Sequence, residues 1–129
     1  MPQTSLVFFQ DAEGAAPVWE WLKDLRVSNP KAFAKCAVRV RRLVELGHEL
    51  RRPEADMLRD GIYELRARHG TVNYRILYFF HGRNVAVLAH AITKENEIPV
   101  VEINRAVGRK RTFIASPVAH TFIGDLENA

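Results

Sequence analysis

The fold of this 129-residue chain is decided by residues 61–80, which read GIYELRARHGTVNYRILYFF. Within this stretch, residues 62–68 and 72–80 have the residue pattern of β-strands, and a short turn separates them. They predict an antiparallel hairpin. Each strand carries an arginine in its interior, Arg66 and Arg75. A lone cation inside a strand must face solvent, pair with a carboxylate or bind an anionic ligand, so the hairpin predicts either a functional site or a structural salt bridge.

A third strand-like run, residues 85–92, extends the hairpin into an antiparallel meander. With the tightest turns, the opposed pairs are Arg75 with His90, Arg66 with Asn73, and Glu64 with Arg75. One face of the meander is therefore expected to gather Glu64, Arg66, Arg75 and His90. The opposite face is apolar and is expected to rest against two N-terminal helices. Its side chains are Tyr63, Leu65, Tyr74, Ile76, Tyr78, Val87 and Ala89.

Helices are predicted before and after the meander along the chain. Pro17 begins a short helix, and Asn29 followed by Pro30 caps a second helix that ends at Gly47. A third helix is predicted over residues 100–111. The other segments are predicted to be a short edge strand at residues 6–9, a connecting loop at 48–60 and an irregular tail from Ser116. The order of these elements predicts an α+β fold.

Length and composition fit a single domain. With 129 residues and 47% hydrophobic content, the chain can form one core, and we place this domain at residues 1–113 with a C-terminal tail at 114–129. The net charge of +4 conceals two acidic ends, because residues 30–114 carry a net charge of +8. A basic centre suits a polyanion such as nucleic acid. For the basic face of the second helix, a solvated surface is the preferred interpretation.

Several other classes of site and location are not expected. The single cysteine, Cys36, excludes an intrachain disulfide and a cysteine metal site. No His, Asp or Glu cluster has metal-ligand spacing, so we expect neither a metal nor another cofactor. The chain begins without a charged leader and apolar run, and no stretch is long enough to cross a bilayer. We therefore expect a cytoplasmic protein with no membrane partner.

Four segments together resemble a known family: GIYELR at 61–66, YRILYFF at 74–80, LAHAITKENEIP at 88–99 and EINRA at 102–106. Over residues 60–113 the chain resembles the phage-derived, HigB-like branch of the RelE/ParE toxin superfamily. The resemblance implies a RelE-like fold, in which an antiparallel sheet carries two N-terminal helices on one face and a groove for RNA on the other. It also implies a cognate antitoxin, for which a helix-turn-helix protein is expected.

The resemblance and the chemistry of the side chains assign roles to individual residues. The expected catalytic residues are Arg75, Arg66, Lys94 and His90, and the expected RNA-binding residues are Arg68, Arg109, Lys110 and Arg111. Attack of a ribose 2′-hydroxyl on its own phosphate needs positive charge near the non-bridging oxygens, which arginine supplies bidentately. Lys94 is a further clamp, or an acid or base. His90 has a suitable pKa for proton transfer, but a structural histidine is an equal alternative.

Two features depart from the family pattern. Many HigB-like toxins carry a second lysine and a threonine beside the Lys94 position, whereas here Thr93 precedes it and residues 95–97, Glu-Asn-Glu, follow it. The local charge is therefore less positive. Some relatives end the last helix with a tyrosine that contributes to the active site, whereas this chain has Phe113, which has no hydroxyl group to donate.

These observations predict the toxin of a type II toxin–antitoxin system. We expect a ribosome-dependent, metal-independent mRNA endonuclease that inhibits translation, with the antitoxin, mRNA and the ribosome as partners. Two other functions stay open: a ParE-like poison of DNA gyrase, and a degenerate member that only binds RNA or its antitoxin and regulates transcription. If Glu64 and Arg75 form only an exposed salt bridge, that pair carries no function.

Overall fold

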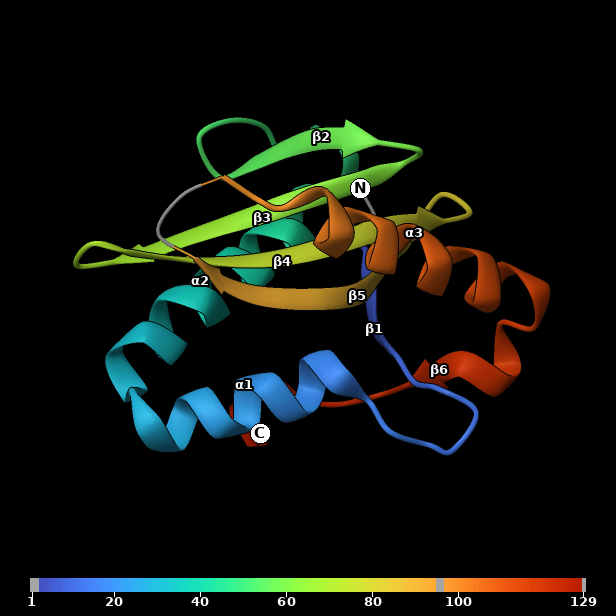
Figure 1. Cartoon of the computed structure of the whole chain (residues 1–129), viewed down its shortest axis with the longest axis horizontal. Coiled ribbons are helices and arrows are strands. Elements are labelled where there is room, and N and C mark those ends of the chain that lie inside the picture. The colour runs from blue at the N-terminus through green and yellow to red at the C-terminus, as the bar shows by residue number, and fades with distance from the viewer. Residues whose placement is uncertain (1–2, 95–96, 129) are drawn as a thin grey trace.

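The computed structural model describes residues 3–94 and 97–128, which form a mixed six-stranded sheet with helices on both faces (Figure 1). The strands are β1 (Ser5–Phe9), β2 (Ala55–Arg59), β3 (Ile62–His69), β4 (Val72–His81), β5 (Val85–Lys94) and β6 (Thr121–Phe122). They lie in the order β2-β3-β4-β5-β1-β6. The helices are α1 (Pro17–Ser28), α2 (Pro30–Leu46) and α3 (Val100–Ala115), with short 3₁₀ turns η1 (Gly47–Glu49), η2 (Val118–His120) and η3 (Leu126–Asn128). The predicted α+β, RelE-like fold class is confirmed.

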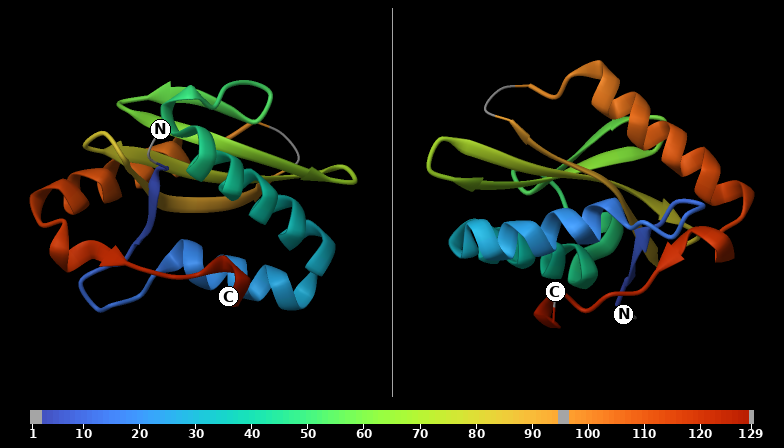
Figure 2. Two further views of the ribbon diagram at one scale, coloured as in Figure 1. Left: turned by 180° about the vertical axis from the view of Figure 1, so that it is seen from behind. Right: turned by 60° about the horizontal axis from the view of Figure 1, so that its bottom comes forward.

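The two N-terminal helices begin where the prolines predict. Pro17 and Pro30 each occupy the first turn of their helix, and the Asn29 side chain caps α2 by accepting a 3.1 Å hydrogen bond from the backbone N–H of Ala32. Both helices lie on one face of the sheet, and α3 lies on the other (Figure 2). No helix among the described residues is both long and apolar enough to span a bilayer.

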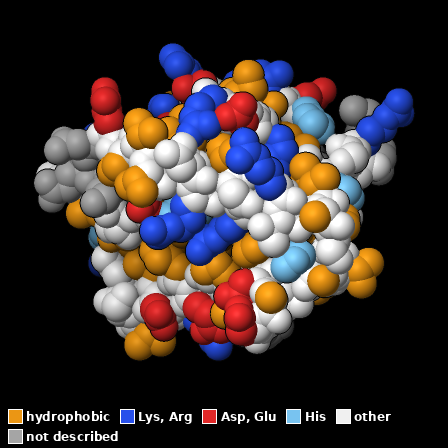
Figure 3. All heavy atoms as spheres, turned by 45° about the vertical axis from the view of Figure 1, so that its right-hand side comes forward, with side chains coloured by type: hydrophobic (Ala, Val, Ile, Leu, Met, Phe, Trp, Pro, Cys, Tyr) orange, Lys and Arg blue, Asp and Glu red, His pale blue; other side chains and the backbone are white. Residues whose placement is uncertain are grey.

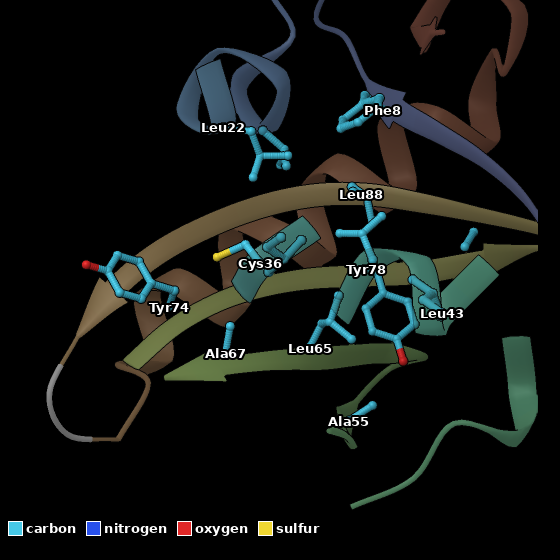
Figure 4. Packing of buried hydrophobic residues seen from close by; sticks show 14 of the residues in the cluster. Phe8, Leu22, Cys36, Leu43, Ala55, Leu65, Ala67, Tyr74, Tyr78 and Leu88 are labelled. Atoms are coloured by element: carbon cyan, nitrogen blue, oxygen red, sulfur yellow. The ribbon is translucent and has the colours of Figure 1, made fainter. Parts of the chain in front are cut away.

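The sheet has an apolar core on each face. The larger core lies beneath α1 and α2 (Figure 4), and its buried side chains include Phe8, Leu22, Leu43, Leu65, Tyr78 and Leu88. The smaller core lies beneath α3 and includes Val7, Phe9, Ile62, Leu77, Phe79, Val87, Ala89 and Phe113. On β3 and β4 this smaller core is confined to Ile62, Leu77 and Phe79. The same face of these two strands continues with charged residues instead.

The register of the meander differs from the prediction. Arg66 lies directly opposite Arg75, and Arg75 lies opposite Ile92. His90 lies opposite Leu77, beside a bulge between Leu77 and Tyr78. The predicted pairs of Arg75 with His90, Arg66 with Asn73, and Glu64 with Arg75 are therefore wrong. Since the register of each predicted pair is shifted by two residues, the four predicted residues still share one face.

The bulge also changes which side chains face α1 and α2. Val87 lies opposite Phe79, and Ala89 falls at the bulge, so both side chains join the smaller core beneath α3. Their predicted place against the N-terminal helices is wrong. An even alternation along β5 cannot anticipate a bulge, because the extra residue reverses the faces of all residues beyond it.

Both edges of the sheet differ from the prediction. β1 is not an edge strand, because it pairs in parallel with β5 and antiparallel with β6 from the tail. The tail is not irregular throughout: the ring of Phe122 packs against Phe8 and Trp19, with centroids 6.2 and 5.4 Å apart. At the other edge, the predicted loop at residues 48–60 contains β2, which pairs with β3.

The C-terminal helix is longer than predicted, because α3 continues to Ala115. Phe113 lies in its last turn and is buried, with its ring 5.4 Å from Phe79 and 5.2 Å from His81. Phe79 is four residues from Arg75 along β4, which corresponds to about 13 Å. Phe113 therefore serves the smaller core at the end of β4 that lies away from Arg75.

Candidate functional site

Arg66 of β3 and Arg75 of β4 converge on one buried carboxylate. Nε of Arg66 donates a hydrogen bond to Oε1 of Glu64, and Nη1 of Arg75 lies 3.7 Å from Oε2 of the same residue. The side chain of Glu64 is 3% exposed, that of Arg75 is 14% exposed and that of Arg66 is 38% exposed. The carboxylate thus holds two guanidinium groups side by side, and Arg66 is the more open to solvent.

The arginine pair retains unused hydrogen-bonding capacity. Within the described residues, the buried Nε of Arg75 and Oε2 of Glu64 have no hydrogen-bond partner. The 3.7 Å separation between Arg75 and Glu64 is too long for a hydrogen bond. Because buried donors in proteins are almost always paired, the N–H of Arg75 Nε calls for an acceptor that the described residues do not supply.

A second carboxylate, Asp56 of β2, joins the site to the edge of the sheet. Its Oδ2 accepts a 2.7 Å hydrogen bond from Nη2 of Arg52 and lies 3.5 Å from Nη2 of Arg66. The hydrogen bond from Arg52 lowers the pKa of Asp56, although desolvation opposes this effect. With Arg75 and Glu64, the cluster has three arginines and two carboxylates, and its net charge is positive.

Two arginines of α2 support β3 from the other side. Nε of Arg39 donates a 2.8 Å hydrogen bond to the backbone oxygen of Arg66, and Arg42 forms hydrogen bonds of 3.0 and 3.2 Å with the Glu54 carboxylate. The hydrogen bond from Arg42 is the largest cause of a lowered pKa at Glu54. This part of the basic face of α2 therefore positions the strand that carries Arg66.

His90 joins β5 to α3. Its Nε2 lies 2.5 Å from Oε2 of Glu102, and its Nδ1 lies 3.0 Å from Nη1 of Arg109. A guanidinium can only donate, so Nδ1 accepts and Nε2 carries the proton that is donated to Glu102. Burial lowers the pKa of His90, against the raising effect of the bond to Glu102, and favours this neutral form. Both ring nitrogens are engaged, which fits a structural role.

The predicted RNA-binding residues are in different environments. Arg109 is half-buried: its Nη1 also donates to the backbone oxygen of Ala89 at 2.8 Å, and its guanidinium lies 5.8 Å from the centre of the Phe9 ring. Lys110 donates to the backbone oxygen of Asp60 at 2.7 Å, which ties α3 to the β2–β3 turn. These two residues hold α3 on the sheet.

Arg68 and Arg111 are exposed. Nε of Arg68 donates a 3.0 Å hydrogen bond to the backbone oxygen of Gly70. Arg111 forms no hydrogen bond or ion pair with any described residue. Lys94 is the last residue of β5, and its backbone pairs with that of Asn73, two residues from Arg75. The side chain of Lys94, like Glu95 and Asn96, lies outside the described residues.

Sequence reasoning missed Asp56 and Glu102, which complete the contacts around Arg66 and His90. Asp56 falls in a predicted loop, where no strand periodicity indicates which way its side chain faces. Glu102 lies in the first turn of α3, where an acidic residue is ordinarily explained by the helix dipole. Only the packing of α3 on β5 brings it to His90. The site therefore contains more negative charge than the sequence indicated.

Lysine and arginine side chains gather on the middle of the face turned forward in Figure 3, and acidic side chains gather below them. In residues 3–94 and 97–128, no three His, Cys, Asp or Glu side chains are arranged so as to hold a metal ion. Burial raises the pKa of the Cys36 thiol to about 12, so this thiol stays protonated and unreactive.

Comparison with known proteins identifies one family. The family model described as phage derived protein Gp49-like (DUF891) matches residues 20–111, which include most of α1, all of α2, the β2–β5 hairpins and most of α3. The matched region contains Glu64, Arg66, Arg75 and His90. No curated protein matches the chain.

Proposed function

Because the chain belongs to the phage-derived Gp49-like family, we propose that it is the toxin of a toxin–antitoxin pair and that it cleaves mRNA on the ribosome. The family and the RelE-like architecture support the toxin role. The charged face of β3 and β4 supports RNA as the target. The proposed partners are mRNA, the ribosome and a helix-turn-helix antitoxin.

The observation that carries the nuclease proposal is the pairing of Arg66 with Arg75. Their backbones are directly opposed, one carboxylate holds both side chains, and Nε of Arg75 lacks a partner among the described residues. Phosphate oxygens, like carboxylate oxygens, match the fork of guanidinium donors bidentately. Side chains fixed before the substrate arrives can stabilise developing negative charge without reorganising.

In the proposed reaction, a ribose 2′-hydroxyl attacks the adjacent phosphorus and the 5′-oxygen of the next nucleotide leaves. The 2′-oxygen loses its proton to a base, and the leaving oxygen gains one from an acid. Arg66 and Arg75 bind the non-bridging oxygens. Lys94, on the strand next to Arg75, is the proposed further clamp or proton-transfer group. The contacts of His90 favour its role as the link between β5 and α3.

The decisive experiment separates loss of function from loss of folding. Arg75→Gln alone leaves the buried Glu64 with less opposing positive charge. We therefore also test the double variant Glu64→Gln/Arg75→Gln, which removes both charges together. Arg83→Gln, at the exposed tip of the β4–β5 hairpin, is the matched control. We expect the wild type and the Arg83 variant to arrest growth and cleave transcripts, and both Arg75 variants to do neither.

Continued cleavage by a folded double variant would overturn the assignment of the site. Growth arrest with intact transcripts and DNA-damage signalling would instead indicate a ParE-like gyrase poison. The carboxylate between the arginines favours a second candidate, a regulator that binds RNA or the antitoxin without cleaving RNA, because it reduces the charge available to a transition state. Strong expression without any growth defect, together with RNA binding, would identify this candidate.

A further inference from the structure

A cavity of about 580 Å³ lies at the β2 edge of the sheet, outside the arginine pair. Its wall is formed by η1, the segment that follows it, β2 and one residue of β3. The lining residues are His48, Leu50, Arg51, Arg52, Ala55, Asp56, Met57 and Tyr63. Its volume lies within the range typical of small-ligand sites, and it combines aromatic, apolar and cationic side chains.

Two aromatic rings of the cavity are held by rings beneath them. His48 stacks on Phe80, with ring centroids 3.6 Å apart and planes inclined by 24°. Tyr63 stacks on Tyr78 at 5.4 Å with an inclination of 19°. A ring fixed in this way loses little conformational freedom when a further planar group stacks on it. Base stacking on aromatic side chains is the common way to hold single-stranded nucleic acid.

Two arginines bring positive charge to the same cavity. Nη1 of Arg51 donates to the backbone oxygens of His48 and Leu50, and Nη2 of Arg52 donates to Asp56. Each guanidinium has five N–H donors on three nitrogens. These hydrogen bonds use one nitrogen of each guanidinium, so the other donors stay available. The side chain of Arg52 is 75% exposed, so it is accessible to a phosphate group of a bound nucleic acid.

The cavity and the arginine pair are contiguous. Asp56 lines the cavity, and its carboxylate touches both Arg52 and Arg66. A chain bound at Arg66 and Arg75 would therefore reach the cavity by crossing β2 at Asp56. An apolar helix would fit poorly here, because it would bury the charges of Arg51, Arg52 and Asp56.

We propose that this cavity is a nucleotide subsite, which holds one nucleotide of single-stranded RNA next to the phosphate bound by Arg66 and Arg75. The base stacks on His48 or Tyr63, and the sugar-phosphate contacts Arg51 and Arg52. The subsite rests on the proposed function for its substrate, and it adds the position of a nucleotide that flanks the cleaved bond. It would thereby contribute to the choice of RNA sequence.

The test uses fluorescent single-stranded RNA in which every 2′-hydroxyl is methylated, so that it binds but cannot be cleaved. Met57 is exposed and lines the cavity, which permits a charge pair at one position: Met57→Glu should weaken binding about fivefold or more, and Met57→Lys should retain or strengthen it. Tyr63→Leu keeps an apolar contact with Tyr78 but removes the stacking surface, and should weaken binding about fivefold or more. Arg83→Gln should bind as the wild type does.

Two further outcomes separate this inference from the proposed function. If the wild type binds the methylated RNA through the cavity but never cleaves unmodified RNA, the subsite stands and the nuclease proposal fails. If the protein cleaves RNA but the folded Met57→Glu and Tyr63→Leu variants bind and cleave unchanged, the subsite is wrong. Displacement of the RNA by an extended peptide that pairs with β2, with no effect of the Tyr63 variant, would also overturn it, since the edge rather than the cavity would be the binding surface.

Discussion

The two faces of β3 and β4 differ sharply in what they contact. Facing α1 and α2, the strands supply apolar or aromatic side chains along most of their length: Leu65, Ala67, Tyr74, Ile76 and Tyr78. Facing α3, Ile62, Leu77 and Phe79 are apolar, but Glu64, Arg66 and Arg75 are charged. The first face stabilises the fold throughout. The second is divided between a smaller core and the charged cluster of the site.

Substitutions of two adjacent residues of β3, one on each face, should show the largest difference between the faces. Leu65 is fully buried against α1 and α2, and we expect Leu65→Ala to lower the free energy of unfolding by about 2–5 kcal/mol. Arg66, on the other face, is partly exposed, but Arg66→Ala leaves the buried Glu64 carboxylate without its hydrogen bond and should cost a smaller amount, about 1–3 kcal/mol. Urea denaturation followed by circular dichroism measures both.

The functional effects of the same two substitutions should have the opposite order. At a temperature where both variants are folded, Leu65→Ala should retain RNA cleavage and Arg66→Ala should lose most of it. A large loss of stability in the Arg66 variant would show that the charged face also carries the fold. The separation of the two faces would then be incorrect.

The buried carboxylate tests the charged face itself. Glu64→Gln keeps the shape of the side chain but leaves Arg75, which is only 14% exposed, without an opposite charge, and should cost about 2 kcal/mol of stability. It also adds one net positive charge beside the proposed phosphate site. We expect tighter RNA binding with a steeper salt dependence, by about one unit of slope.

The substitution Glu13→Gln is the matched control for this change, since it adds the same net charge at an exposed position between β1 and α1, outside the site. If Glu13→Gln steepens the salt dependence equally, overall charge rather than the site determines RNA binding. Fluorescence anisotropy over a range of salt concentrations separates the two results.

Much of the fold could be predicted because its signals are local. Pro17, and Asn29 with Pro30, fix where two helices begin, since capping and a preset φ act within one turn. The alternation of apolar and polar residues predicted the strands β3, β4 and β5. β2 escapes prediction because its sequence, ADMLR, has no β-branched or aromatic residue and a register shift between Met57 and Arg59 interrupts its alternation, and β6 because it has only two residues. Such strands form only when a neighbouring strand is present.

The site could be predicted in part for the same reason. The shared face of Arg66 and Arg75 depends only on the parity of two strands, and it is confirmed. The contacts of Asp56, Arg109 and Lys110 depend on how β2 and α3 dock, and no local pattern indicates that docking. The catalytic roles themselves stay predictions.

Two glycines, one in the packed tail and one on the exposed surface of α3, should respond oppositely to an added methyl group. At Gly124, in the tail that packs with α1, an added Cβ would lie 2.5 Å from the ring of Trp19, so Gly124→Ala should cost about 1–3 kcal/mol. At Gly108, in α3, a Cβ meets nothing within 4 Å, and Gly108→Ala should stabilise the protein by about 0.5–1 kcal/mol. Thermal unfolding gives the sign of each change. Equal effects would mean that the tail is not packed on the helical face.

The smallest expected effect concerns pH and the link between β5 and α3. Desolvation lowers the pKa of His90 in the folded protein below its ordinary 6.5, and Glu102, Arg105 and Arg109 are the charged groups that face it. The unfolded chain then binds a proton more readily than the folded one, so stability falls as pH drops from about 6.5 towards the folded pKa.

We expect His90→Gln to be less stable than the wild type at neutral pH, and to lose less stability between neutral pH and pH 5, because it has no proton to bind. The control His81→Gln, at the exposed end of β4, should keep the acid dependence of the wild type. Urea midpoints measured across this range decide the matter. If the His90 variant keeps the full acid dependence, another group titrates, and the neutral His90 between Glu102 and Arg109 does not link β5 to α3 as described.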